Sequence, residues 1–271
     1  MLPEPSALLV ADSFRVRRNP VSGAAEVRGW RMHLDRFARS ARAAAAELGA
    51  ELDVETSADS ADGLDAFLLQ ARDRIAEYGE GFPRLELLLG EPRGSAPADD
   101  RTAKERPELR LSLRPLPELR ETLELRSVLA DPLPHPERKG PGIDRLGALN
   151  RELGAEALLT DAEGLAVEGA TTSLLWWEGR TLCSVRTTAR VASVTERILL
   201  GIAERLGTPT ARSRAEPVAL AGREVWAVNA LHGLRTVTRI DGVLAPPPDP
   251  GRLSGFRQAL DRSWEPLATI R

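Results

Sequence analysis

Residues 156–177 read EALLTDAEGLAVEGATTSLLWW, and this stretch decides the expected fold. Three apolar runs, at 157–160, 165–168 and 173–177, are separated by an Asp-Ala-Glu-Gly turn and a Gly-Ala-Thr-Thr loop. A Glu-Gly turn then leads to a fourth run at 181–184. Short apolar strands joined by tight turns are typical of an antiparallel sheet. We therefore expect an antiparallel meander over 157–184.

Helical and extended patterns flank this meander on both sides. Apolar residues at helical spacing predict helices over 32–48, 63–78, 144–153, 194–206 and 252–264. Strand patterns cover 7–16, 84–90, 108–113, 122–129, 209–212, 224–228 and 236–240. In the first of these strands, Asp12 indicates a polar turn that breaks the run.

The order of these elements predicts an α+β chain with two domains. A Pro-Leu-Pro-Glu segment at 115–118 has the composition of a linker. It separates a small N-terminal α/β domain at 1–114 from a larger C-terminal domain at 115–271, which has a mixed sheet and a barrel-like core.

Composition excludes several functional classes. The 271 residues carry 37 basic and 40 acidic side chains, and a net charge of −3 does not favour nucleic acid or an anionic membrane as partner. A single cysteine and three scattered histidines supply neither a disulfide framework nor a metal site. P-loop, dinucleotide-binding and serine-hydrolase motifs are absent. With no membrane-spanning run and no signal-peptide pattern, we expect a cytoplasmic protein.

Lysine chemistry has only two candidates, Lys104 and Lys139. Lys104 lies in a polar loop rich in Pro, Gly and Asp, which is typical of a solvated side chain. Lys139, beside Arg138 in a Pro/Gly loop, has the same pattern when taken alone. Reactive lysines need burial or a cationic neighbour.

Four features together point to one cofactor. Lys139 offers an amine, Glu168 a carboxylate at a strand end, and the helix expected at 194–206 an N-terminus that favours a phosphate. Arg36 could add a bidentate charge. An amine, a carboxylate and a phosphate cradle form the set that pyridoxal 5′-phosphate (PLP) requires. Each residue taken alone also has an ordinary structural role, as surface ion pair, strand edge or helix start.

The chain resembles the class IV aminotransferases, PLP-dependent enzymes of fold type IV that include branched-chain and D-amino-acid aminotransferases and aminodeoxychorismate lyase. HLDRFARSARAAAAELG at 33–49 resembles the helix that carries the phosphate-binding arginine of this family, which implies that role for Arg36. The stretch at 156–177 resembles the region whose glutamate meets the pyridine nitrogen, which implies Glu168. The resemblance makes Lys139 the Schiff-base lysine and the catalytic residue.

Two further stretches extend the resemblance. SVTERILL at 193–200 is similar to the phosphate turn of the family, which implies that Val194 and Thr195 bind the cofactor. Asn229-Ala-Leu resembles the N-A-L stretch of aminodeoxychorismate lyases, and it adds Ala230 and Leu231 to the cofactor-binding residues. The resemblance also implies a homodimer, and a substrate that is an amino acid or amine converted by transamination or by a lyase reaction.

The sequence also departs from the family pattern. Ser193 and Glu196 stand where the phosphate turn usually has glycine and arginine, and the N-terminal G-x-x-x-F-E-T stretch has no counterpart. Two other interpretations therefore stay open. One is a specialised enzyme of secondary metabolism that acts on another amine. The other is a degenerate scaffold that binds PLP or a partner without turnover.

Overall fold

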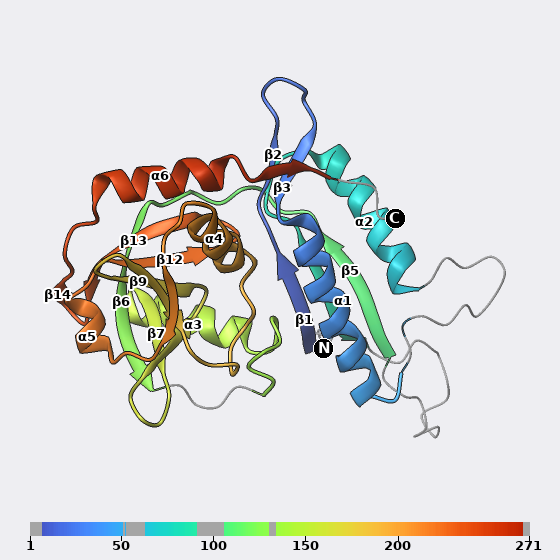
Figure 1. Ribbon diagram of the computed structural model, residues 1–271. Helices are drawn as coiled ribbons and strands as arrows, with labels where there is room; N and C mark the ends of the chain where they lie inside the picture. Colours follow the sequence, from blue (N-terminus) through green and yellow to red (C-terminus); the bar gives the residue numbers. More distant parts are fainter. Residues whose placement is uncertain (1–6, 51, 53–62, 91–105, 130–133, 268–271) are drawn as a thin grey trace.

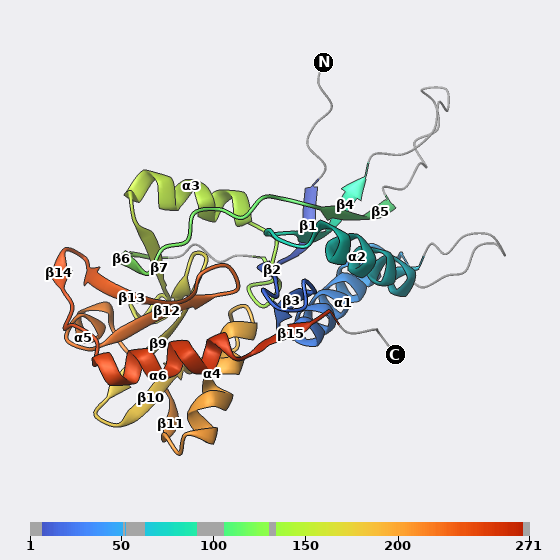
Figure 2. The same ribbon diagram turned by 90° about the horizontal axis from the view of Figure 1, so that it is seen from above.

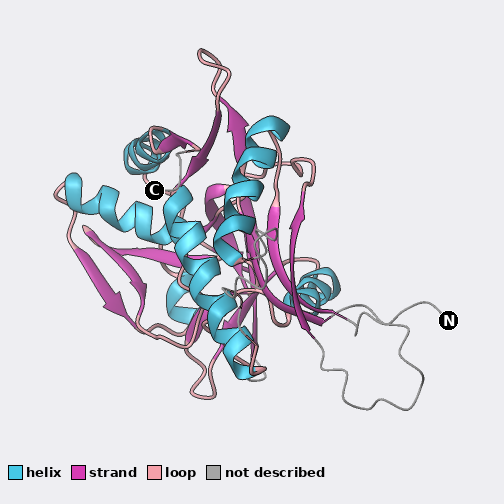
Figure 3. Cartoon of the chain, turned by 90° about the vertical axis from the view of Figure 1, so that its right-hand side faces the viewer, coloured by secondary structure: helices cyan, strands magenta, loops and turns pink. Residues whose placement is uncertain are grey.

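The computed structural model describes residues 7–50, 52, 63–90, 106–129 and 134–267. The chain forms two regions that lie side by side, one carrying helices α1 and α2 and the other a large curled sheet (Figure 1). Viewed from the side of the first region, helices cross in front of the strands (Figure 3). None of the described helices is long and apolar enough to cross a lipid bilayer.

A three-stranded antiparallel sheet supports the N-terminal region. Its strands, in spatial order, are β1 (Ala7–Ser13), β4 (Arg84–Gly90) and β5 (Arg106–Ser112). Two helices pack with this sheet, α1 (Trp30–Glu47) and α2 (Leu64–Tyr78). Leu34, Phe37 and Ala41 recur at helical spacing on α1 and are buried. These apolar faces form a core of their own in this region.

The start of α1 lies against the start of α4 (Val194–Arg205). Gly29 precedes α1 with a φ of 68°, a left-handed conformation that favours glycine. A Cβ at this position would stand 2.7 Å from Cγ1 of Val194. The glycine therefore permits the close contact between two helix starts that come from different regions of the chain.

The end of the chain returns to the N-terminal region. Helix α6 (Pro250–Asp261) leads across to β15 (Trp264–Pro266), beside β3 (Figure 2). The three strands β15, β3 (Ala25–Arg28) and β2 (Val16–Arg18) form a small antiparallel sheet. Strand β15 therefore ties the two regions together. The domain division at 114/115 stays a prediction.

The second region is built on one mixed sheet of nine strands. The order is β11-β10-β9-β12-β13-β6-β7-β8, with β14 added to β13. The strands are β6 (Thr122–Leu129), β7 (Glu156–Thr160), β8 (Ala166–Gly169), β9 (Ser173–Glu178), β10 (Thr181–Val185), β11 (Thr210–Ser213), β12 (Val225–Asn229), β13 (Gly233–Ile240) and β14 (Val243–Leu244). The backbone N–H of Ala166 donates to the carbonyl of Ala215 over 2.9 Å, so the two ends of the sheet approach each other and the sheet curls.

Buried apolar clusters lie on both faces of the curled sheet, and helices cover it. Inside the curl, Leu125, Leu174 and Trp176 belong to one buried cluster. On the other face, α4 and α6 pack around Trp177, Trp226 and Phe256, whose rings meet edge to face at 5.1 to 5.7 Å. Two further helices are α3 (Ile143–Leu153), which packs on β7, and the short α5 (Pro217–Ala221).

Most predicted elements are confirmed, and the α+β class with a barrel-like sheet is correct. The helix expected at 252–264 ends at Asp261, and Trp264 begins strand β15 instead. Two further expectations are wrong. The meander breaks after Glu168, because Gly169 and Thr172 close a turn and β8 pairs with β7 while β9 pairs with β10 and β12. The polar turn expected at Asp12 is also absent: β1 runs through this residue, whose carboxylate is buried among partners that the local sequence does not reveal.

Candidate functional site

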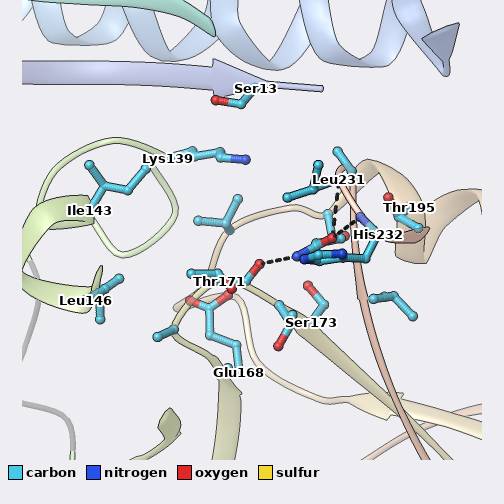
Figure 4. Close-up of a pocket in the computed structure, with 18 of the residues that line it drawn as sticks. Ser13, Lys139, Ile143, Leu146, Glu168, Thr171, Ser173, Thr195, Leu231 and His232 are labelled. Atoms are coloured by element: carbon cyan, nitrogen blue, oxygen red, sulfur yellow. Dashed lines mark hydrogen bonds between the residues drawn. The ribbon is translucent and has the colours of Figure 1, made fainter. Parts of the chain in front are cut away.

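A cavity of about 640 Å³ lies between the two regions. Side chains from β1 and α1 form its wall on the N-terminal side. The other walls come from the 136–141 loop, the start of α3, the loop between β8 and β9, the start of α4, and the loop after β12. In the close-up view, Lys139 enters the cavity from one side, while Thr195 and His232 lie on the other (Figure 4).

The loop that carries Lys139 is bound to strand β1. Its backbone carbonyl accepts a 2.8 Å hydrogen bond from the N–H of Ala11 in β1. Gly140 follows with a φ of 131°, and a Cβ there would stand 2.6 Å from the same backbone nitrogen. Burial, with the positive charge of Arg36, lowers the pKa of Lys139 to about 8, against a partial offset by Asp12. The side chain is therefore not the solvated lysine that its loop composition indicates.

Glu168, at the end of β8, shares this cavity. Burial raises its pKa to about 8, although the charge of Arg190 and a hydrogen bond from the N–H of Val191 oppose the shift. Glu168 is one of the residues that line the cavity. A carboxyl in this environment holds its proton at neutral pH until a cation approaches it.

The loop after Glu168 is fixed by one carboxylate at the start of β7. Glu156 accepts hydrogen bonds from the N–H and hydroxyl of Thr171 at 2.6 and 2.9 Å, and from the hydroxyl of Thr172 at 3.1 Å. It also accepts a bond from the amide of Asn150 at 3.1 Å. Because the loop forms part of the cavity wall, Glu156 determines where that wall stands.

Arg36 joins a buried cluster on the N-terminal wall. Its Nε and Nη2 donate to the two oxygens of Asp12, each over 2.8 Å, and His33 contacts the same carboxylate at 2.8 Å. Burial alone would raise the pKa of Asp12, but Arg36 and His33 hold it well below its usual range. The remaining Nη1 donates to the carbonyl of Ala192 over 2.8 Å. This bond places the guanidinium beside the start of α4.

The start of α4 is capped and its charge is compensated. The hydroxyl of Ser193 accepts from the N–H of Glu196 at 3.2 Å. Glu196 forms two 2.6 Å bonds with Arg190, so the acid that replaces the arginine of the family pattern is neutralised locally. Val194 and Thr195 are buried and line the cavity, and their N–H groups have no acceptor within the helix.

Asn229 orders the loop after β12. Its side-chain oxygen accepts from the N–H of Leu231 at 3.2 Å and from that of His232 at 2.8 Å. Its amide donates to the carbonyl of Thr171 over 3.3 Å. The asparagine therefore joins two walls of the cavity, and Ala230 lines the cavity beside it.

The structure brings every predicted site residue to this one cavity: Arg36, Lys139, Glu168, Val194, Thr195, Ala230 and Leu231. Their roles stay predictions. Lys104 lies outside the described residues. Sequence reasoning missed Asp12, Glu156 and Arg190. A charged residue inside an apolar strand was the available signal for Asp12, whereas the other two give none.

Comparison with known proteins gives a consistent result. A family model described as amino-transferase class IV matches residues 9–240. No curated protein sequence is significantly similar to the chain.

Several solved structures share the fold. The branched-chain amino acid aminotransferase of T.th., complexed with N-(5′-phosphopyridoxyl)-L-glutamate, superposes with a TM-score of 0.73 at 17% identity, covering 94% of this chain and 84% of that one. A Legionella pneumophila protein assigned as a 4-amino-4-deoxychorismate lyase gives 0.71 at 19% identity, covering 94% and 90%. The branched-chain aminotransferase of the archaeon Thermoproteus uzoniensis gives 0.73 at 18% identity, covering 96% and 90%.

Proposed function

Because this chain belongs to the class IV aminotransferase family, whose enzymes use PLP, we propose that it converts an amino acid or amine with Lys139 as the lysine that holds the cofactor. The reaction is that of an aminotransferase or of an enzyme similar to aminodeoxychorismate lyase. One observation carries the proposal: an amine from the 136–141 loop and a carboxyl from the end of β8, both half-buried, line one cavity with pKa values both displaced to about 8.

The residues of the cavity fit PLP. A volume of about 640 Å³ is within the usual range for a cofactor with its substrate. The cavity presents an amine, an acid and the first N–H groups of α4, those of Val194 and Thr195, which have no acceptor inside the helix; these match the aldehyde, ring nitrogen and phosphate of the cofactor. When bound, PLP supplies an electron sink for the carbon that carries the substrate amine.

Lys139 acts first as a nucleophile and then as a base. With a pKa of about 8, a substantial fraction of this amine is neutral under mildly alkaline conditions, as nucleophilic attack requires. With the substrate bound, the neutral Nζ of Lys139 would accept the proton of the substrate Cα. Transamination would then require Nζ to return this proton with no group leaving the substrate, whereas a lyase reaction would require a leaving group such as pyruvate to depart.

Glu168 is proposed to pair with the protonated ring nitrogen. Its carboxyl holds a proton readily, because burial has raised its pKa to about 8. A cationic partner within hydrogen-bond distance would favour the carboxylate and share that proton. The charge of Arg190 and a hydrogen bond from the N–H of Val191 also act on this carboxyl and favour its ionised form.

The phosphate is proposed to lie at the start of α4. Val194, Thr195, Ala230 and Leu231 all line the cavity, and the N–H groups of Val194 and Thr195 have no acceptor within the helix. Arg36 is anchored beside it through Ala192. Since two of its nitrogens already hold Asp12, Arg36 contributes mainly by position and charge.

The test is to add candidate amino donors to the PLP-loaded protein and follow both the cofactor absorbance and the products. A keto acid with loss of the visible band identifies an aminotransferase, and pyruvate released from 4-amino-4-deoxychorismate identifies a lyase. If the PLP-loaded protein keeps its visible band with every amino donor tested and releases no product, the proposal is contradicted and the non-catalytic scaffold is favoured.

The resemblance extends the proposal to the whole molecule. We propose a cytoplasmic homodimer whose domains meet at 114/115, with the cofactor held mainly by the larger domain. Sedimentation of the purified protein tests the dimer directly, since a monomer at micromolar concentration would contradict it.

A further inference from the structure

The loop that carries Lys139 is bound to the N-terminal region at two points. The first is the backbone bond from the N–H of Ala11 in β1 to the carbonyl of Lys139, over 2.8 Å. The second is an ion pair one residue earlier in the loop. Nη1 and Nη2 of Arg138 donate to the two carboxylate oxygens of Glu47, over 3.0 and 2.7 Å. Glu47 is the last residue of α1, so the loop is attached to both β1 and α1.

The ion pair of Arg138 with Glu47 is bidentate. Two parallel N–H···O bonds between a guanidinium and a carboxylate fix the direction of the contact as well as its length. The Arg138 side chain is 7% exposed and that of Glu47 is 48% exposed. The bonds from Arg138, with the charge of His135, hold the pKa of Glu47 below its usual range, so the carboxylate is ionised at neutral pH.

The turn that precedes Lys139 meets the same carboxylate. The backbone N–H of Arg138 donates to the carbonyl of His135 over 2.9 Å and closes this turn. His135 has a φ of 54°, and its Nε2 lies 3.6 Å from a carboxylate oxygen of Glu47. Glu47 therefore contacts the first and the last residue of the turn, and Lys139 is the next residue along the chain.

Arg138 acts on Lys139 through the backbone and not through its charge. Although Arg138 lines the cavity, both of its terminal nitrogens are bound to Glu47, so the guanidinium holds a protein contact. The charges that act most strongly on the Lys139 amine belong to four other residues, Arg36, Asp12, Arg84 and Arg114. Loss of the ion pair would therefore change the amine chiefly by changing where it lies.

The attachment crosses the cavity. Glu168 lies in β8, and Val194 and Thr195 begin α4, so these predicted cofactor residues belong to the second region. Lys139 lies just before α3 in the same region, yet its loop is bound to β1 and α1. The place of the amine relative to Glu168 and α4 depends on this attachment. A displacement of about 1 Å in a reacting group can reduce a rate about 100-fold.

We infer that Arg138 and Glu47 are positioning residues for Lys139: their ion pair holds the loop of the lysine against the end of α1 and keeps the amine withdrawn from bulk solvent in the cavity. The inference rests on the proposed function, in which Lys139 holds the cofactor, and it adds two residues that touch neither cofactor nor substrate.

The test measures the pH at which Lys139 reacts half-maximally with a small amine-reactive reagent in the full-length apoprotein. The Lys104→Ala background leaves Lys139 as the single lysine. Burial lowers the pKa of Lys139 from 10.5 to about 8, so a loop released into solvent should move the half-maximal pH back toward 10.5. We expect a rise of about one pH unit or more in both Glu47→Gln and Arg138→Gln. An unchanged half-maximal pH in both variants would overturn the inference.

A double variant shows whether the two residues act through one contact. If they do, Glu47→Gln combined with Arg138→Gln should shift the half-maximal pH no further than either single change, whereas a sum of the two shifts would refute a shared role. Arg252→Gln is the matched control, because Arg252 forms a 2.8 Å ion pair with Glu224 away from the cavity. A shift of equal size in the control would also refute the inference.

The stability of the variants separates positioning from a merely structural contact. Glu47 is half exposed, so Glu47→Gln should unfold in urea close to the midpoint of the wild type. A lower midpoint with an unchanged half-maximal pH would show a structural role only and contradict the inference. Should Arg138→Gln fail to fold, Glu47→Gln decides.

The absorbance of the PLP-loaded wild type separates this inference from the proposed function. If the wild type has no band at the violet edge of the visible range, the proposed function fails. If the band is present and neither Glu47→Gln nor Arg138→Gln moves the half-maximal pH of Lys139, only the positioning role is wrong.

Discussion

Lys139 should titrate far below an ordinary lysine in the cofactor-free protein. Burial and the charge of Arg36 lower its pKa from 10.5 to about 8. At pH 7 an amine of pKa 8 is about 9% neutral, whereas one of pKa 10.5 is about 0.03% neutral, a difference of about 300-fold. The neutral fraction rises with pH, so reactivity should reach half of its plateau near pH 8.

The sequence makes this measurement specific to one side chain. Lys104→Ala leaves Lys139 as the single ε-amine of the chain. A trace of a small amine-reactive reagent is added to the apoprotein across a pH series, and mass spectrometry follows the peptide that contains residue 139. The Lys139→Ala variant gives the background, and the N-terminal amine is recognised by its own peptide. A half-maximal pH near 10.5 would refute the buried, cation-flanked environment.

Two further substitutions test the charges around the cavity. Arg36→Met should lower the free energy of unfolding by about 3 to 5 kcal/mol at neutral pH in urea titrations, because it leaves the buried carboxylate of Asp12 without its main counterion. The pKa of Asp12 is lower in the folded protein than its unfolded value near 4, so the Asp12 carboxylate stabilises the wild type at pH values above 4. The difference in unfolding free energy between the wild type and Arg36→Met should therefore shrink as the pH falls below 4. Arg39→Met, at an exposed residue, is the control, and an equal loss of stability there would contradict this explanation. Glu196→Gln should cost about 3 kcal/mol by stranding the buried guanidinium of Arg190, and a change below about 0.5 kcal/mol would show that their short bonds contribute little.

Local patterns in the sequence predicted most of the fold. Apolar spacing predicts the helix at 32–48, which the structure has at Trp30–Glu47, and short apolar runs with turns indicate the strands of the large sheet. Pairings between distant segments could not be predicted in the same way. Strand β15 at Trp264–Pro266 pairs with β3 at Ala25–Arg28, and no local signal in either segment encodes that contact.

In the site, too, local sequence predicted the residue types but not the contacts between distant segments. Lys139 and Glu168 could be selected as residue types at a suitable order and spacing, but their burial could not be read from loop composition. Asp12 resembles a turn residue until Arg36 and His33, one to two helical turns into α1, are brought onto it by tertiary packing.

The most direct test of the central claim is the absorption spectrum of the purified protein with and without added PLP, for the wild type, Lys139→Ala and Lys104→Ala. We expect a band at the violet edge of the visible range in the wild type and in Lys104→Ala, and no such band in Lys139→Ala. A band that persists in Lys139→Ala, or that disappears in Lys104→Ala, would contradict the assignment of Lys139 as the lysine that holds the cofactor.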